Sequence, residues 1–270
     1  MPRDVLTLKE LIAGTRYEGF HLAYTRTRSK NEAYNERNLV TISRYPIVKS
    51  QSILRDLLTN KIQYNLLTDA EDKVKDIRWE RPIFYTQIEL ASGDILHVMN
   101  VHLKSRNPTS ITGQREGYSW KSVTGWTEGY FLSALKRIGQ AFEARVLIDQ
   151  IFDADPEAKI VICGDFNAHA GEVPIDAIMG KVENTGNPDL LFRVMFPCED
   201  TVPESRRYTH IHHGQGNLLD HMLISRRMLE VYRGAEIHNE ALHDESVSFA
   251  FDSKFPESDH APFIGKFDLT

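Results

Sequence analysis

The chain has 270 residues, of which 41% are hydrophobic and 26% charged, so it is neither disordered nor fibrous and can bury one large core. Its formal net charge of -6 argues against a protein that coats nucleic acid by charge alone. No apolar run could cross a bilayer, and no linker or repeat divides the sequence, so we expect one soluble domain over residues 1–270.

The first half of the chain contains four apolar stretches of the kind that form strands. They are residues 5–10, 38–48, 83–90 and 95–103. The last two flank a short turn that contains glycine, which predicts a hairpin.

The second half mixes helices with strands. A long loop is predicted over residues 104–128 and is followed by apolar residues at helical spacing, namely Leu135, Ile138, Phe142 and Val146. A second helical candidate covers residues 188–196, and strands are expected at 160–163, 218–225 and 259–269. This order predicts a mixed α/β domain with sheets packed face to face under flanking helices.

The run KIVICGDFN, residues 159–167, places polar side chains directly behind a buried strand. Four apolar residues precede Gly164, so Asp165 and Asn167 are expected at a strand end, where polar groups can converge on a ligand. Asp and Asn also favour β-turns, and on this fragment alone a turn and a functional site are equally well supported.

Five segments share this pattern of an apolar stretch that ends in an acid, an amide or a histidine. They contain Glu10, Asn100 with His102, Asp165 with Asn167, Asp220 with His221, and Asp259 with His260. Together they resemble the endonuclease/exonuclease/phosphatase superfamily, the fold of DNase I, abasic-site endonucleases, sphingomyelinases, inositol polyphosphate 5-phosphatases and deadenylases. The resemblance covers nearly the whole chain, and the pairing of GDFN with a C-terminal SDH is its most specific part.

The resemblance implies a four-layer α-β-β-α sandwich of two packed mixed β-sheets flanked by helices. In the superfamily a strand precedes the segment DVLTLKE, and Met1 leaves no room for it, so we expect this first strand to be lacking. A cytoplasmic location is favoured for the chain as given, and secretion stays open if an N-terminal segment is missing.

The activity implied by the resemblance is hydrolysis of a phosphodiester by metal-activated water, in the first place by a nuclease. A phosphatase, a phospholipid phosphodiesterase and a catalytically impaired phosphate-binding domain are the alternatives. The partner is a phosphate-ester substrate, with DNA and RNA among the candidates. Carboxylate and amide oxygens suit Mg²⁺ or Mn²⁺. The metal ligands implied are Glu10, Asp259, Asp165 and Asn167.

The resemblance also implies a role for each polar group. Asp165 would orient or deprotonate the attacking water, and Asn167 would help to hold the water and the phosphate. His260 would donate to the scissile phosphate, with its tautomer fixed by Asp220. His102 would be a second phosphate donor.

Several of these residues have a structural alternative. Glu10 could face solvent on an N-terminal helix, and Asn100 could be a satisfied core amide. His221 points to the opposite face of its strand from Asp220 and is expected to be structural.

Two further features have open interpretations. Residues 113–132 carry Trp120, Trp126 and other aromatic side chains, and we expect a wall beside the substrate, with a self-packed hydrophobic cluster as the alternative. The histidines near residue 212 suggest a zinc hydrolase as an alternative function. This alternative is disfavoured because the histidines form no helical i, i+4 pair and have no carboxylate motif near them in the sequence.

Overall fold

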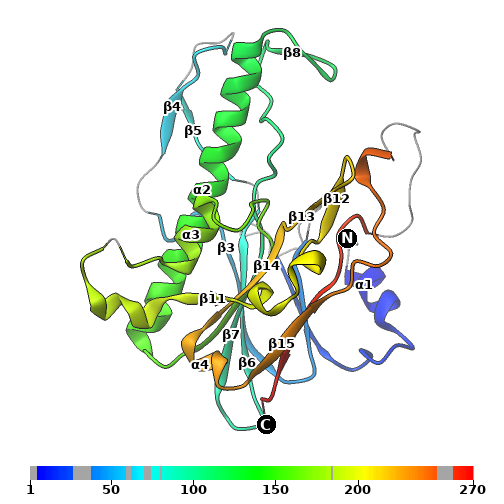
Figure 1. The fold of residues 1–270 in the computed structure, drawn as a ribbon, viewed down its shortest axis with the longest axis vertical. Helices are drawn as coiled ribbons and strands as arrows, with labels where there is room; N and C mark the ends of the chain where they lie inside the picture. Colours follow the sequence, from blue (N-terminus) through cyan, green and yellow to red (C-terminus); the bar gives the residue numbers. More distant parts are fainter. Residues whose placement is uncertain are drawn as a thin grey trace.

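The computed structural model of the chain describes residues 5–26, 38–58, 62–69, 74–79, 81–183, 185–247 and 258–269. At its centre is a six-stranded mixed sheet in the order β11-β14-β10-β7-β6-β3 (Figure 1). These strands are β3 Ile47–Ile53, β6 Ile83–Glu89, β7 Ile95–His102, β10 Lys159–Asp165, β11 Met195–Pro197 and β14 Asp220–Ser225. Strands β7 and β10 are parallel, and the other neighbouring pairs are antiparallel.

Helices cover one face of this sheet. Helix α2, Val123–Ala154, makes the crossover from β7 to β10 that a parallel pair requires, and α3, Val173–Met179, packs beside it. The core between helices and sheet includes Ile148 of α2 and Ile160 and Ile162 of β10, all fully buried.

The opposite face of the sheet is covered by a two-stranded ribbon of β15, Tyr232–Ile237, and β16, Phe263–Phe267. Val161, between the two isoleucines of β10, packs on this side. The run 160–163 is therefore buried on both faces, as its continuous apolar sequence predicts.

The layered α/β prediction is confirmed by the mixed sheet, its helices and the ribbon behind it. Among the described residues the second β-layer consists of two-stranded ribbons. The remaining elements are α1 Val5–Ile12, β1 His21–Tyr24, β2 Val40–Ser43, β4 Gln63–Asn65, β5 Val74–Asp76, β8 Arg115–Glu116, β9 Ser119–Trp120, η1 Pro188–Arg193, η2 Cys198–Thr201, η3 Glu204–Arg206, β12 His210–His212, β13 Gln215–Asn217 and α4 Arg226–Leu229.

Helix α2 begins earlier than the apolar spacing predicts, because Ser122 caps its N-terminus by accepting a hydrogen bond from the backbone N–H of Gly125. The predicted helical face was also wrong at Phe142, which is 55% exposed. The helix instead buries several polar side chains, and these accept hydrogen bonds from the backbone of neighbouring loops. Gln140 accepts from Lys104 N–H at 2.7 Å, and Glu143 accepts from Arg55 N–H at 3.0 Å.

Two other local predictions were wrong. Residues 188–196 form a short 3-10 helix and the edge strand β11, and residues 5–10 form helix α1 where an apolar strand was expected. Both segments are too short for hydrophobic periodicity alone to separate helix from strand.

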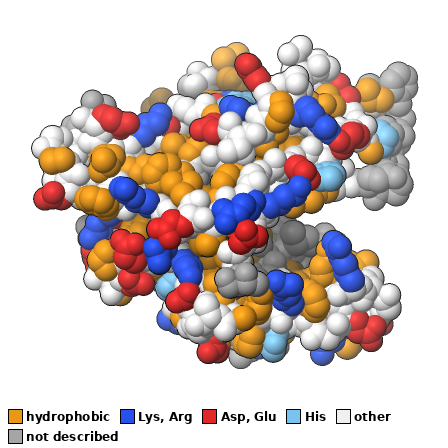
Figure 2. Space-filling model, turned by 60° about the horizontal axis from the view of Figure 1, so that its bottom comes forward, with side chains coloured by type: hydrophobic (Ala, Val, Ile, Leu, Met, Phe, Trp, Pro, Cys, Tyr) orange, Lys and Arg blue, Asp and Glu red, His pale blue; other side chains and the backbone are white. Residues whose placement is uncertain are grey.

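At the end of the molecule that carries the β6–β7 turn, charges of both signs are mixed. Acidic and basic side chains are interspersed among hydrophobic ones on this face (Figure 2). Within the described residues no helix is long and apolar enough to cross a membrane.

The spacing between β10 and β7 depends on Gly164. This glycine has a φ of 131°, and a Cβ atom there would lie 2.1 Å from the carbonyl oxygen of Val101. We expect Gly164→Ala to lower the free energy of unfolding by about 3 kcal/mol, because a backbone clash adds to an unfavourable φ. Chemical denaturation measures this.

The matched control is Gly93→Ala in the β6–β7 turn. Gly93 also has a positive φ, 84°, but a Cβ atom added there would have no atom within 4 Å. Only the cost of a positive φ for alanine, about 1 kcal/mol, therefore applies. Equal losses in the two variants would contradict the close approach at Gly164.

Candidate active site

Three of the expected residues lie at one level of the central sheet. In the strand register, Asp165 at the end of β10 is opposite His102 of β7 on one side and Asp220 of β14 on the other. Cross-strand partners point to the same face of a sheet, so the three side chains lie side by side. This is the face that the β15–β16 ribbon covers, and Asp259 and His260 lie in the segment that leads into β16.

His260 forms a close pair with Asp220 across the two β-layers. Its Nδ1 lies 2.6 Å from Oδ2 of Asp220. Burial lowers the pKa of His260, but the hydrogen bond and charge of Asp220, with the charges of Asp165 and Asp259, outweigh burial and raise the pKa from 6.5 to about 9. The imidazole is therefore protonated at neutral pH, and no described residue engages its Nε2.

A second carboxylate–histidine pair lies beside the first. Nε2 of His102 is 3.1 Å from Oδ2 of Asp165. Burial raises the pKa of Asp165. The opposing effects are larger, and they come from the hydrogen bond and charge of His102, the charge of His260 and the N–H of Asn167. The net pKa is therefore below the usual value, and the carboxylate stays ionised.

Asn167 is held rigidly in this corner. Its backbone N–H donates to Oδ1 of Asp165 at 2.8 Å, and its Nδ2 donates to Oδ2 of Asp165 and to the carbonyl of Leu103. Its φ of 49° is a left-handed conformation that asparagine tolerates. The turn that the sequence offered as one interpretation is thus present, and both residues also line a cleft, where Oδ1 of Asn167 is the amide atom left for a ligand.

These residues line a single cleft of about 920 Å³. The expected site residues along its wall are Asn100, His102, Asp165, Asn167, Asp220, Asp259 and His260. Asn100 donates to the carbonyl of Val40 at 3.1 Å, so it ties β7 to β2 while facing the cleft. Arg81 and Arg106 add two cations to the same wall.

Glu10, the expected principal metal ligand, is not brought to this cleft. It lies on helix α1 with an exposed side chain, as in the structural alternative for this residue. The apolar residues before it belong to the helix, so no strand end presents the carboxylate beside Asp165.

His221 has the structural role expected for it. It is 1% exposed, its Nδ1 lies 2.5 Å from Glu199 and its Nε2 lies 2.8 Å from the carbonyl of Ala168. Burial opposes the charged form, but the hydrogen bond and charge of Glu199 raise the pKa of His221 on balance. The pair supports β14 from the face opposite to Asp220.

Thr209 is a supporting residue that sequence reasoning missed. It is fully buried, and its Oγ1 accepts hydrogen bonds from the N–H groups of Leu219 and Asp220, both at 3.1 Å. Its carbonyl accepts from Ala261 N–H at 2.8 Å, so one residue fastens the segments that carry Asp220 and His260. A lone threonine in a loop carries no sequence signal for such a role.

The β12–β13 hairpin contributes a second group that the sequence did not resolve. His210 is 7% exposed, its ring centre is 5.2 Å from that of His260, and its Nε2 lies 3.0 Å from Glu245. The prediction that these histidines lack a nearby carboxylate was wrong, because Glu245 and Asp259 come from distant parts of the chain.

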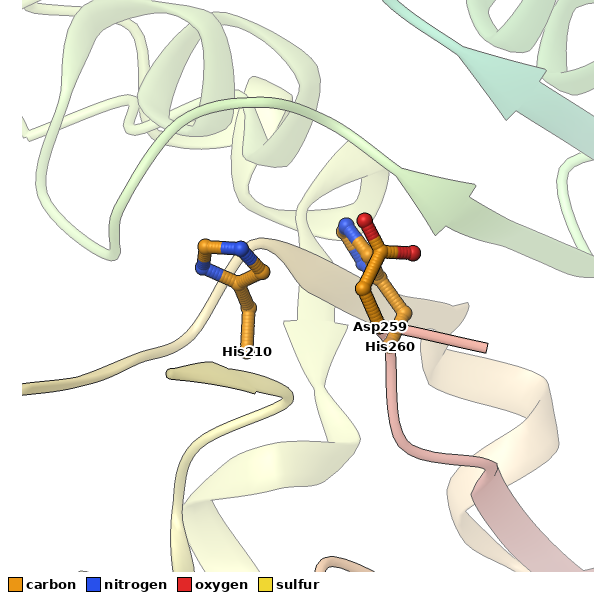
Figure 3. Close-up of side chains that lie close together, drawn as sticks. All are labelled: His210, Asp259 and His260. Atoms are coloured by element: carbon orange, nitrogen blue, oxygen red, sulfur yellow. The ribbon is translucent and has the colours of Figure 1, made fainter. Parts of the chain in front are cut away.

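A divalent cation is implied by the resemblance, and the cleft supplies part of the expected ligand set. Asp165, Asn167 and Asp259 offer the hard oxygen donors that Mg²⁺ and Mn²⁺ prefer, without Glu10. Among the described residues, one group of three brings a ligand atom from each member within 4.8 Å of the other two, and it consists of His210, Asp259 and His260 (Figure 3).

The predicted aromatic loop is divided between a small hairpin and α2. Trp120 lies in β9 under the guanidinium of Arg115, and Trp126 and Tyr130 lie on α2 with stacked rings. The last two are 44% and 40% exposed, so they do not form a self-packed core.

Comparison with known proteins places residues 73–247 within the sequence profile described as the Endonuclease/Exonuclease/phosphatase family. No curated protein matches the chain.

Solved structures match over almost the whole chain. The 3′ phosphatase NExo from Neisseria, bound to a product DNA hairpin, has a TM-score of 0.52 and 16% identity over 99% of this chain and 83% of that one. The 3′-5′ exonuclease NExo from Neisseria meningitidis gives 0.51 and 15% over 97% and 82%. The human Nocturnin catalytic domain with bound sulfate gives 0.51 and 16% over 98% and 75%. At these identities the likeness establishes a shared fold.

The pairing of His260 with Asp220 predicts a titration that can be observed. In chelator-treated protein, NMR titration of the His260 ring should give a pKa near 9, and Asp220→Asn should return it toward 6.5. Because the folded-state pKa is raised, the pair contributes stability that is complete below about pH 6.5 and is lost as the pH rises through about 9. An unchanged pKa in Asp220→Asn would contradict the pairing.

Proposed function

Because the chain belongs to the endonuclease/exonuclease/phosphatase family, we propose that it is a divalent-metal-dependent phosphodiesterase that hydrolyses nucleic acid. The observation that carries this proposal is the presence of two carboxylate–histidine pairs, Asp165–His102 and Asp220–His260, on adjacent strands of one cleft. Members of the family are in general hydrolases of phosphoester bonds, and the choice of a nucleic-acid diester is our proposal.

The protonation states of the two pairs suit phosphodiester hydrolysis. Asp165, ionised, accepts the proton of the attacking water as the water oxygen bonds to phosphorus and the ester P–O bond breaks, and the departing oxygen keeps the bonding electron pair and takes a proton from solvent water. His260, protonated and oriented by Asp220, donates a hydrogen bond from Nε2 to a phosphate oxygen and neutralises its growing charge. His102 is the second donor on the same wall, and Asn167 holds water and phosphate in place.

Asp165, Asn167 and Asp259 are the residues that would hold Mg²⁺ or Mn²⁺. When bound, such an ion supplies charge to neutralise the phosphate and to acidify water.

We base the proposed substrate class on an exposed pair of aromatic side chains on α2. The loop that provides Arg106 to the cleft wall is fastened to α2, where Ser133 donates to the carbonyl of Asn107 at 2.8 Å and the carbonyl of Gly129 accepts from Thr109. From Ser133 to Trp126 the helix rises about 10 Å, and Figure 1 shows this part of α2 extending beyond the sheet.

Trp126 and Tyr130 belong to this part of α2, with ring centres 5.7 Å apart and planes inclined by 15°. Exposed flat rings of this kind stack on nucleobases, while a small phosphoester without a base has nothing to stack on them. With a net charge of -6, stacking and the local cations Arg81 and Arg106 would bind the strand instead of a broad positive surface.

We expect Asp165→Ala to lower turnover of a small synthetic phosphodiester by at least about 100-fold in the presence of Mg²⁺ or Mn²⁺, the size expected for loss of a positioned acid–base group. His260→Ala should lose activity similarly, and a chelator should abolish it. Steady-state kinetics with a thermal melt for each variant measures this.

Glu183→Ala is the matched control, since it removes an exposed acid far from the cleft wall. Near-normal turnover in Asp165→Ala, or activity that needs zinc and ignores magnesium, would overturn the mechanism.

The substrate class is tested by Trp126→Ala combined with Tyr130→Ala. Loss of the stack should raise KM for a single-stranded oligonucleotide about 10-fold to 100-fold, because base–aromatic stacking contributes about 1–3 kcal/mol per base. KM for the small phosphodiester should not change.

Phe142→Ala is the control for removal of an exposed aromatic ring, because Phe142 lies on the lower half of the same helix and is 55% exposed. If the oligonucleotide KM is unchanged in the double variant, the nucleic-acid assignment fails and a phosphatase or another phosphodiesterase of the family takes its place.

A further inference from the structure

We propose that His210, Asp259 and His260 form a binding site for a transition-metal ion of the zinc type, which shares Asp259 with the oxygen-rich magnesium site and differs from it in its two imidazole ligands. The three residues come from two separate segments, the β12 strand and the turn that leads into β16. Figure 3 shows them grouped, with His210 facing Asp259 and His260.

The geometry needs little adjustment to accept an ion. One ligand atom from each residue lies within 4.8 Å of the other two. Metal–nitrogen bonds of about 2.0–2.1 Å place the ligand atoms of a tetrahedral ion about 3.3 Å apart, so closure requires movements of at most about 1.5 Å. Asp259 is exposed on a turn and can move this far, while His210 is buried and fixed.

The ligand types select the ion. Two imidazole nitrogens with one carboxylate oxygen suit Zn²⁺ and its spectroscopic substitute Co²⁺, whereas Mg²⁺ prefers oxygen ligands and retains its waters. Three protein ligands leave at least one coordination position open, as in catalytic and exchangeable zinc sites.

Each histidine of the group also has a carboxylate partner on its ring. Asp220 engages Nδ1 of His260 at 2.6 Å, and Glu245 lies 3.0 Å from Nε2 of His210. Carboxylates placed this way orient metal-binding imidazoles and raise their basicity.

The competing explanation is a purely structural hydrogen-bond network. It provides no partner for Nε2 of His260, which no described residue engages, although ligand atoms of His210 and Asp259 lie within 4.8 Å of that of His260. A free imidazole nitrogen beside a carboxylate and a second imidazole is a feature of ligand sites.

Occupancy of the site has a consequence for the cleft. An ion there takes the one nitrogen of His260 that Asp220 leaves free, so metal binding and donation by His260 to a phosphate exclude each other. This consequence rests on the proposed function, whereas the site itself does not. Zinc should therefore inhibit hydrolysis supported by Mg²⁺.

The site is tested by titrating chelator-treated, full-length protein with Co²⁺ and recording the visible absorption of the bound ion, then displacing it with Zn²⁺. One ion per chain should bind, and an excess of Mg²⁺ should not displace it. His210→Gln and Asp259→Asn should each weaken binding more than about 10-fold, and Glu245→Gln should weaken it about 10-fold to 100-fold, as expected for a partner of a ligand.

His213→Asn is the matched control, because it removes an exposed imidazole from the same hairpin and asparagine tolerates the φ of 50° at this position. Its affinity should equal that of the unmodified protein. Thermal melts without metal identify variants that fail to fold, and the exposed Asp259 keeps the test valid if His210→Gln does not fold.

Equal Co²⁺ affinity in all the variants, or displacement by Mg²⁺, would overturn the inference. Hydrolysis with Mg²⁺ in a protein that binds no Co²⁺ would overturn the metal site and leave the proposed function intact. Binding of Co²⁺ in a protein that hydrolyses no phosphodiester would support the metal site and overturn the proposed function.

Discussion

The constraint on which the site depends is the register of β10 between β7 and β14. This register sets His102, Asp165 and Asp220 at the same level and on the same face of the sheet. A shift of β10 by one residue would turn Asp165 toward the helices and bring its neighbour Gly164 or Phe166 to the cleft side. Burial of the strand on both faces opposes such a shift, because Ile160 and Ile162 would exchange sides with Val161 and Cys163.

The second requirement is that two layers meet at the end of β10. The central sheet supplies Asp220, and the segment before β16 supplies His260, so their hydrogen bond joins the layers exactly where the cleft lies. Thr209 bonds to both segments, which makes the position of the imidazole a property of the packed fold and not of one loop. Separation of the layers would uncouple the charge on His260 from the carboxylate that stabilises it.

Sequence reasoning succeeded where local pattern and packing agree. The apolar run before Gly164 predicted a strand buried on both faces, and the opposite orientations of Asp220 and His221 followed from strand alternation. It failed where tertiary contacts decide. Phe142 fits the helical spacing, yet the loops that α2 anchors require polar side chains on its buried face. Glu10 and the grouping of His210 with Asp259 depend on how distant segments pack, which no local pattern encodes.

His260 has one nitrogen fixed by Asp220 and one nitrogen without a partner among the described residues, and in the proposed mechanism this free nitrogen donates to the phosphate. The surrounding carboxylates raise the pKa of the ring, which favours a protonated donor whenever phosphate is present and no soft ion competes. The same carboxylates also attract cations. An ion of the zinc type would replace the proton at that nitrogen, so the features that would prepare His260 to bind phosphate would also make it sensitive to metal.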